Sequence, residues 1–154
     1  MYNKILLPID GSDHSKLAVK HAIDIANRNN GDITVLFVIE PNYPSLPVLP
    51  IATLPTPDDN YYDELRDEGN KIIEEFKVEI EKNQLDGKCQ NINFSTMIRE
   101  GKPHIEILET MKEKDFDLLV MGASGKHSTI DRLTLGSVTE MVIRESKIPI
   151  MVIP

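Results

Sequence analysis

A glycine-bearing segment near the end of the chain carries the residue types that bind phosphate groups. It runs from Met121 to Lys126 and, after an interval, from Gly136 to Thr139. Glycines let backbone N–H groups approach an anion closely, and the first turn of a helix adds unpaired N–H groups and about half a positive charge. Ser137 contributes a hydroxyl donor. The alternative is that the glycines only turn the chain and that Gly136 only caps a helix, and spacing alone does not decide between the two.

A second group of candidate residues lies at the end of the first apolar run. Asp10 directly follows this run, where its carboxylate could accept hydrogen bonds from a ribose or bind a metal ion. It could equally accept a hydrogen bond from the backbone of its own turn. Pro8 lacks the N–H that a central strand needs, so we expect it where strand pairing is ending, at the edge of a ligand crevice.

The elements that position these residues follow from the hydrophobic pattern. Short apolar or alternating runs predict strands over Lys4–Ile9, Ile33–Ile39, Ile92–Ile98, Phe116–Met121 and Ile148–Ile153. Apolar residues at helical spacing predict helices from Ser12 to Asn29, around Leu65 to Ile80, from Pro103 onward with Ile105, Leu108 and Met111 inward, and from Gly136 to Ser146. The charged residues of the second helix are expected to form a solvated face.

Alternating strands and helices predict an α/β fold. We expect a single doubly wound domain over residues 1–154, with a five-stranded parallel sheet of order 3-2-1-4-5 and helices on both faces. In such a sheet the ligand crevice lies outside the carboxyl ends of the strands, where the winding direction reverses. That point falls between the first and fourth strands, which brings Asp10 and the glycine-bearing segment together.

Composition excludes several classes of function. A net charge of −8 with scattered Lys and Arg disfavours nucleic-acid binding, and the apolar runs are too short to cross a membrane. The amino terminus has no signal-peptide pattern, and the lone Cys89 has no partner for an internal disulfide, so we expect a cytoplasmic protein. The histidines lack metal-ligand spacing and the serines lack the setting of a nucleophile elbow, so no catalytic residue is assigned.

Two further segments carry expectations of their own. Residues 41–57 are rich in proline and lack periodicity, which predicts a long loop beside the crevice that acts as a mobile lid. The last strand, with Pro149 to Ile153, is apolar and should be an edge strand without a charge to block pairing. Such an edge favours a homodimer joined through this strand.

Taken together, these residues resemble the universal stress protein family in its ATP-binding branch. The signature of that branch is Gly, two residues, Gly, nine residues, then Gly-Ser or Gly-Thr. Here it corresponds to Gly122, Gly125 and Gly136-Ser137, with ten residues instead of nine in the long interval. The resemblance extends over the whole chain. We expect the additional residue to alter the loop from His127 to Ile130 and not to abolish the site, although it puts any role of Lys126 in doubt.

The resemblance implies a set of ligand contacts. Adenine would lie near Val38 and Pro8, and ribose near Asp10 and Gly122. The phosphates would lie against Gly125, Gly136, Ser137, Val138 and Thr139. Ile9, Met121 and Lys126 complete the predicted binding set. The implied ligand is ATP, and because the chain is acidic overall, Mg²⁺ is expected to accompany it, with its protein ligands unassigned.

The resemblance and the missing catalytic set favour a binding module. The leading hypothesis is a dimeric, nucleotide-dependent regulatory or stress-response protein with at most slow ATP hydrolysis. The alternative is a phosphate-transferring or nucleotide-hydrolysing enzyme of the adenine nucleotide alpha hydrolase-like superfamily. In that case Asp10 would position a metal and Lys126 would meet the charge of the transition state.

Overall fold

Strands and helices alternate along the chain in the predicted order. The computed structural model describes residues 2–41, 59–85, 92–125 and 135–154. The elements are β1 (Lys4–Ile9), α1 (Asp13–Asn29), β2 (Asp32–Ile39), α2 (Asp59–Leu85), β3 (Phe94–Glu100), α3 (Pro103–Glu113), β4 (Leu118–Gly122), α4 (Ser137–Glu145) and β5 (Ile150–Ile153). Lys126, Cys89 and residues 42–57 of the predicted loop lie outside the described residues.

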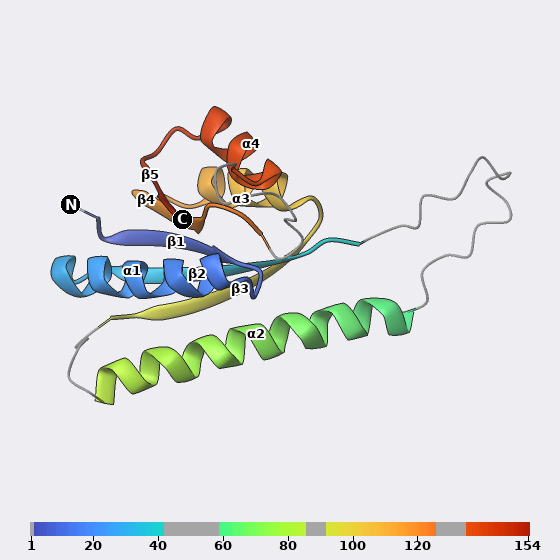
Figure 1. Cartoon of the computed structure of the whole chain (residues 1–154), viewed down its shortest axis with the longest axis horizontal. Coiled ribbons are helices and arrows are strands. Elements are labelled where there is room, and N and C mark those ends of the chain that lie inside the picture. The colour runs from blue at the N-terminus through green and yellow to red at the C-terminus, as the bar shows by residue number, and fades with distance from the viewer. Residues whose placement is uncertain (1, 42–58, 86–91, 126–134) are drawn as a thin grey trace, which may run out of the picture.

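The five strands form one parallel sheet in the order β3-β2-β1-β4-β5, which confirms the predicted topology (Figure 1). β1 is central, and the chain winds outward from it first through β2 and β3, then through β4 and β5. The winding direction therefore reverses between β1 and β4. A crevice at the carboxyl ends of these two strands is where a sheet of this kind holds its ligand.

Two layers of helices cover the sheet. α1 and α2 pack on one face around buried residues that include Ile5, Val35 and Val120. α3 and α4 pack on the other face, where Leu6 and Leu119 belong to a second buried cluster (Figure 1). Because successive side chains of a strand point to opposite faces, β1 contributes to both clusters, and its apolar run is explained by burial on both sides.

Helix α1 begins and ends at the residues that the sequence indicates. Ser12 is its N-cap, and the Ser12 side chain accepts a hydrogen bond from the backbone N–H of Ser15. Asn30 ends the helix in the left-handed conformation, which asparagine tolerates better than most residues. The start of α1 is thereby fixed directly after Asp10, at the carboxyl edge of the sheet.

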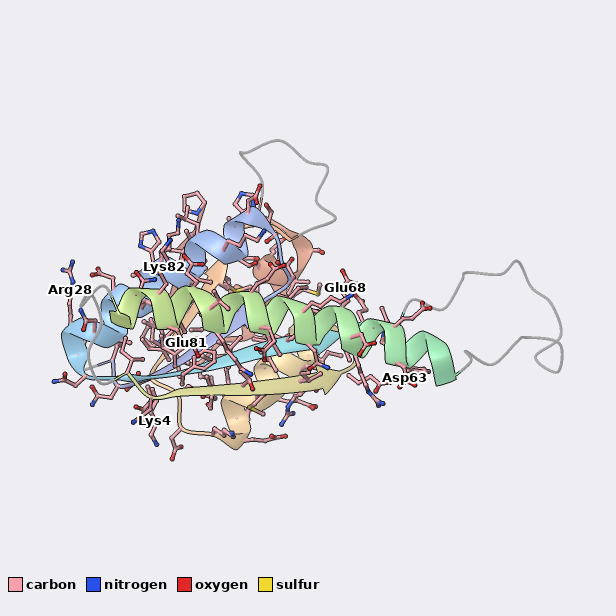
Figure 2. All side chains as sticks on the ribbon, turned by 90° about the horizontal axis from the view of Figure 1, so that it is seen from below. Lys4, Arg28, Asp63, Glu68, Glu81 and Lys82 are labelled. Carbon is pink, nitrogen blue, oxygen red and sulfur yellow. The ribbon has the colours of Figure 1, made fainter. Side chains whose placement is uncertain are left out.

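The long helix α2 has one buried and one solvated face, as predicted. Ile73, Phe76 and Ile80 are buried against the sheet, and the ring of Phe76 stacks on that of Phe94 in β3 with centroids 5.8 Å apart. Figure 2 looks onto the opposite face of α2, along which the charged side chains of Asp63, Glu68, Glu81 and Lys82 are exposed. No helix in the described part of the chain has the length and apolarity that a membrane span requires.

Four details differ from the sequence prediction. β3, β4 and β5 each begin two residues later than expected, and Ile92 and Phe116, which open the first two of these runs, are buried before strand pairing starts. In α3, Ile105 is 40% exposed instead of inward. The buried stripe of α3 is centred on Ile107 and Leu108, and Ile105 lies about 200° around the helix from Ile107.

Candidate functional site

Two helices start at the same edge of the sheet, and the turn after β4 lies between their first turns. On one side, a Cβ placed on Gly122 would be 2.8 Å from the Cβ of His14 in α1. On the other side, the N–H of Gly136 donates to the carbonyl of Ala123 at 2.8 Å. The topology thus brings the predicted Gly122, Gly125 and Gly136 together with the end of β1.

The N-terminus of α1 is occupied by its own side chains. Ser12 Oγ accepts from Ser15 N–H at 3.1 Å, and the Ser15 hydroxyl donates to the Ser12 carbonyl at 2.9 Å. Asp10 Oδ1 accepts from Ser12 N–H at 3.0 Å, so Asp10 does have the turn role that the sequence left open. Its other oxygen, Oδ2, would be 2.8 Å from a Cβ placed on Gly125. Asp10 therefore joins β1 to the glycine turn and lies within the candidate site.

The N-terminus of α4 is different because its N-cap is Gly136, which has no side chain to accept a hydrogen bond. The first helical bond runs from Glu140 N–H to the Gly136 carbonyl at 2.9 Å. The N–H groups of Ser137, Val138 and Thr139 precede it in the first turn and so have no acceptor within the helix. The Ser137 side chain is exposed beside them. This arrangement of donors suits an anion.

Thr139 has a structural role in this turn. Its side chain is only 3% exposed, and its hydroxyl donates to the carbonyl of Gly122 at 3.0 Å. The hydroxyl is therefore used to join α4 to the end of β4, and Thr139 offers a ligand only its backbone N–H.

The apolar candidates divide between the two faces of the sheet. Val38 packs against the buried cluster under α3 and α4, and Met121, which is 5% exposed, belongs to that cluster. Pro8 lies two residues after Leu6 in β1, so the alternation of the strand directs Pro8 to this face as well. Pairing of β1 with β4 ends at Leu6 opposite Leu119, so Pro8 lies beyond it on that side, while on the other side Pro8 is still paired with Leu36 of β2. The Ile9 side chain, 5% exposed, is in the core under α1. Only its backbone can reach a ligand on the α4 side.

One contact in the site has no counterpart in the sequence prediction. The Ser124 hydroxyl and the Nδ1 atom of His14 lie 3.1 Å apart in a hydrogen bond between the glycine turn and the first turn of α1. The two residues are 110 positions apart in the chain. Because neither belongs to a spacing motif, only the packing of Gly122 under α1 could have indicated this pair.

Two other hollows of the described structure lie away from the β1–β4 edge. One of about 180 Å³ lies between α1 and α2, and one of about 440 Å³ lies by the amino ends of β1, β2 and β3, far from the glycine turn along each strand. Among the described residues, no three His, Cys, Asp or Glu side chains gather as ligands of a metal ion. The β1–β4 edge remains the site with the most complete set of donors.

The fold defines the class of protein: a doubly wound α/β domain, with the N-terminus of α4 at its switch point and no side-chain cap on that helix. The model of the universal stress protein family matches residues 1–154, and the chain belongs to this family. It is 33% identical to universal stress protein MJ0531 of Methanocaldococcus jannaschii over 99% of this chain and 82% of that protein.

Solved structures agree with this assignment. Universal stress protein UspA from Lactobacillus plantarum superimposes with a TM-score of 0.75 at 27% identity, covering 99% of this chain and 98% of that one. A universal stress protein in complex with cAMP shares the fold, with a TM-score of 0.62 at 24% identity and coverage of 99% and 96%.

Proposed function

We propose that this protein is an ATP-binding regulatory module of the universal stress protein family, acting in the cytoplasm as a homodimer. The observation that carries the proposal is the contrast between the two helix N-termini at the β1–β4 edge. α1 is capped by Ser12, whereas α4 begins with a glycine and leaves the N–H groups of its first turn directed toward the edge. Those donors, with the positive end of the helix dipole, suit a phosphate.

The other parts of an adenine nucleotide have matching surroundings. Val38 and Pro8, both half-buried, offer an apolar edge on the α4 side for the base. Asp10, beside Gly125, is placed to accept hydrogen bonds from a ribose. The phosphates would then extend toward Gly136 and Ser137. This order follows from the chemistry of the residues. A protein with the same fold is known in complex with cAMP, which is an adenine nucleotide.

Mg²⁺ is proposed to enter with the nucleotide. The phosphates themselves supply oxygen ligands, as is usual for this ion. Asp10, the carboxylate beside Gly125, would ligate the ion as an alternative to its proposed contact with the ribose, and the described residues offer no group of three metal ligands.

The dimer is proposed to form through β5. This strand lies at the edge of the sheet, so one side of its backbone lacks a neighbouring strand among the described residues, and its four residues, Ile150 to Ile153, carry no charge. Met151 is 37% exposed on it. An apolar edge without charged or bulged residues favours pairing with a twofold-related copy.

The ligand class can be tested on the purified protein. The protein is denatured and the released small molecules are chromatographed, after which fresh protein stripped of ligand is titrated with Mg-ATP. We expect ATP or ADP in the released fraction, or saturable binding of Mg-ATP by the stripped protein. If nothing is released and millimolar Mg-ATP does not bind, the proposal is wrong.

A further inference from the structure

We propose that His14 and Ser124 make nucleotide binding respond to pH, with the imidazole of His14 strengthening the hold on phosphate when it is protonated. This inference rests on the proposed function and adds its regulation. His14 lies in the first turn of α1, and Ser124 lies in the glycine turn that separates α1 from α4. The pair therefore stands between the two helix N-termini.

The position of Ser124 links the pair to the phosphate donors. A Cβ placed on Gly136 would be 3.2 Å from Ser124 Cα and 3.6 Å from Gly125 N, so the backbone of the turn packs directly on the start of α4. On the opposite side of the same turn, Gly122 packs on the backbone of His14. Both side chains of the pair are partly buried, which holds them in place while leaving access to solvent.

Protonation changes what this hydrogen bond can do. A neutral imidazole has one nitrogen that accepts, so Nδ1 can take the hydrogen of the Ser124 hydroxyl. In the imidazolium both ring nitrogens donate, so Nδ1–H must donate to Ser124 Oγ. The hydrogen of Ser124 is then free to point at a phosphate oxygen. Protonation thus adds a positive charge beside the site and releases a hydroxyl donor, and both effects favour an anion.

Charged groups surround the first turn of α1. Among the described residues they are Asp13 and Lys16 on α1, Asp10 after β1, and Glu75 and Glu79 on α2, which line a hollow together with Ser15 and Lys16. The described turn from Gly122 to Gly125 and strand β5 carry none. Histidine is the side-chain type whose charge change ordinarily falls in the neutral range, so histidine variants are the ones that test the response.

The test is the affinity for Mg-ATP, measured by titration calorimetry between about pH 5.5 and pH 8. We expect binding by the parent to strengthen by on the order of tenfold as the pH falls, because one charge of the right sign is added close to the phosphates. His14→Gln keeps a polar side chain of similar reach but cannot take up a proton. The affinity of this variant for Mg-ATP should change with pH only as much as protonation of the ATP itself causes.

Three further variants distinguish the proposed action of His14 and Ser124 from an effect of another histidine. His21→Gln, on the exposed side of α1, and His127→Gln, between Gly125 and Gly136 in sequence, should keep the parental response. Ser124→Ala keeps the charge and loses the released hydroxyl, so its response should be intermediate. A parental response in His14→Gln overturns the inference, as does its loss in His127→Gln alone. If no variant and no parent binds Mg-ATP at any pH, the proposed function fails instead.

Discussion

The Thr139 hydroxyl donates a hydrogen bond to the Gly122 carbonyl at 3.0 Å and so joins the first turn of α4 to the last residue of β4. The bond is partly buried, because the Thr139 side chain is only 3% exposed and Gly122 is half-buried. It fixes the distance between the glycine turn and the helix whose N-terminus we propose to bind phosphate. The same contact therefore contributes to stability and to the shape of the site.

Thr139→Val should destabilise the protein by about 1 kcal/mol, because the shape is kept while the partly buried Gly122 carbonyl loses a donor. Thr110→Val is a matched control, since the buried Thr110 hydroxyl donates to Glu106 within its own helix, where that carbonyl also serves the helix. Urea unfolding measures both. Equal losses in the two variants would show that the Thr139 bond has no special role.

Replacing Gly122 or Gly125 by alanine should lower the stability of the protein to different extents. In Gly122→Ala the new Cβ would be 2.8 Å from His14 Cβ and 3.0 Å from the His14 carbonyl carbon, so the first turn of α1 must move. We expect a loss of about 1 to 3 kcal/mol from this overpacking. In Gly125→Ala the described contact of the new Cβ is with Asp10 Oδ2 at 2.8 Å, and the end of a side chain moves more easily than the backbone of α1, although its hydrogen bond to Ser12 N–H resists the movement.

Thermal or urea unfolding of the two variants gives the comparison. Gly122→Ala should unfold at clearly lower denaturant than the parent, and Gly125→Ala close to it. The reverse order would mean that Gly122 is not packed under α1 as the structure has it.

The stabilisation from the ion pair between Arg99 of β3 and Glu113 of α3 should depend on pH. The hydrogen bond from the Arg99 guanidinium, with the positive charges of Arg99 and Lys114, holds the pKa of Glu113 below its ordinary value of 4.5 against a smaller opposing effect of burial. A carboxylate with a lowered pKa in the folded state stabilises the fold above about pH 4.5. That stabilisation is lost as the pH falls through the folded-state pKa.

Glu113→Gln should therefore unfold at lower urea than the parent at neutral pH, and the difference should vanish at about pH 3. Glu109→Gln, which is exposed on the same helix, is the control and should behave as the parent at both values. A difference that persists unchanged in acid would show that the ion pair is not its cause. The effect is expected to be small because the Glu113 side chain is 53% exposed.

The proposed dimer predicts a sharp effect of charge on β5. Met151→Lys places an ammonium group on the edge strand and should convert the dimer to a monomer at micromolar protein, since charged residues are what natural edge strands use to prevent pairing. Leu17→Lys changes a residue of similar exposure on α1 and should leave the dimer intact. Sedimentation velocity distinguishes the two. A parent that is monomeric at all concentrations would refute the dimer itself.

Most of the fold could be predicted because local signals and topology agree. Ser12 and Asn30 mark the ends of α1 by their residue types, and the alternation of strands and helices leaves few arrangements for a parallel sheet. The strand bounds were predicted wrongly where buried apolar residues precede the strand, and the face of α3 was predicted wrongly where two residues fitted the same pattern. Ile92 and Phe116 are buried ahead of their strands, and in α3 two isoleucines, Ile105 and Ile107, both fit a helical stripe although only Ile107 is buried.

The site could be predicted in part for a related reason. Glycine and serine at a helix start predict an anion site from residue type alone, and Gly136 is indeed the N-cap of α4 and Ser137 its first residue. The use of the Thr139 hydroxyl within the protein and the contact of His14 with Ser124 could not be predicted. Both depend on how segments distant in sequence pack side by side, and no spacing in the chain encodes that.

The most direct test of the account is titration calorimetry of Mg-ATP into the parent, Ser137→Ala and Gly136→Val, with circular dichroism confirming that each is folded. Ser137→Ala removes one exposed hydroxyl, and since a hydrogen bond to a charged group contributes about 1.5 to 3 kcal/mol, affinity should fall roughly ten- to a hundredfold. Gly136→Val should bind still more weakly. Its side chain would occupy the space in front of the first turn, and its Cβ would press on Ser124 Cα at 3.2 Å. If folded Gly136→Val binds Mg-ATP as tightly as the parent, the phosphates do not lie at the N-terminus of α4 and the central claim is wrong.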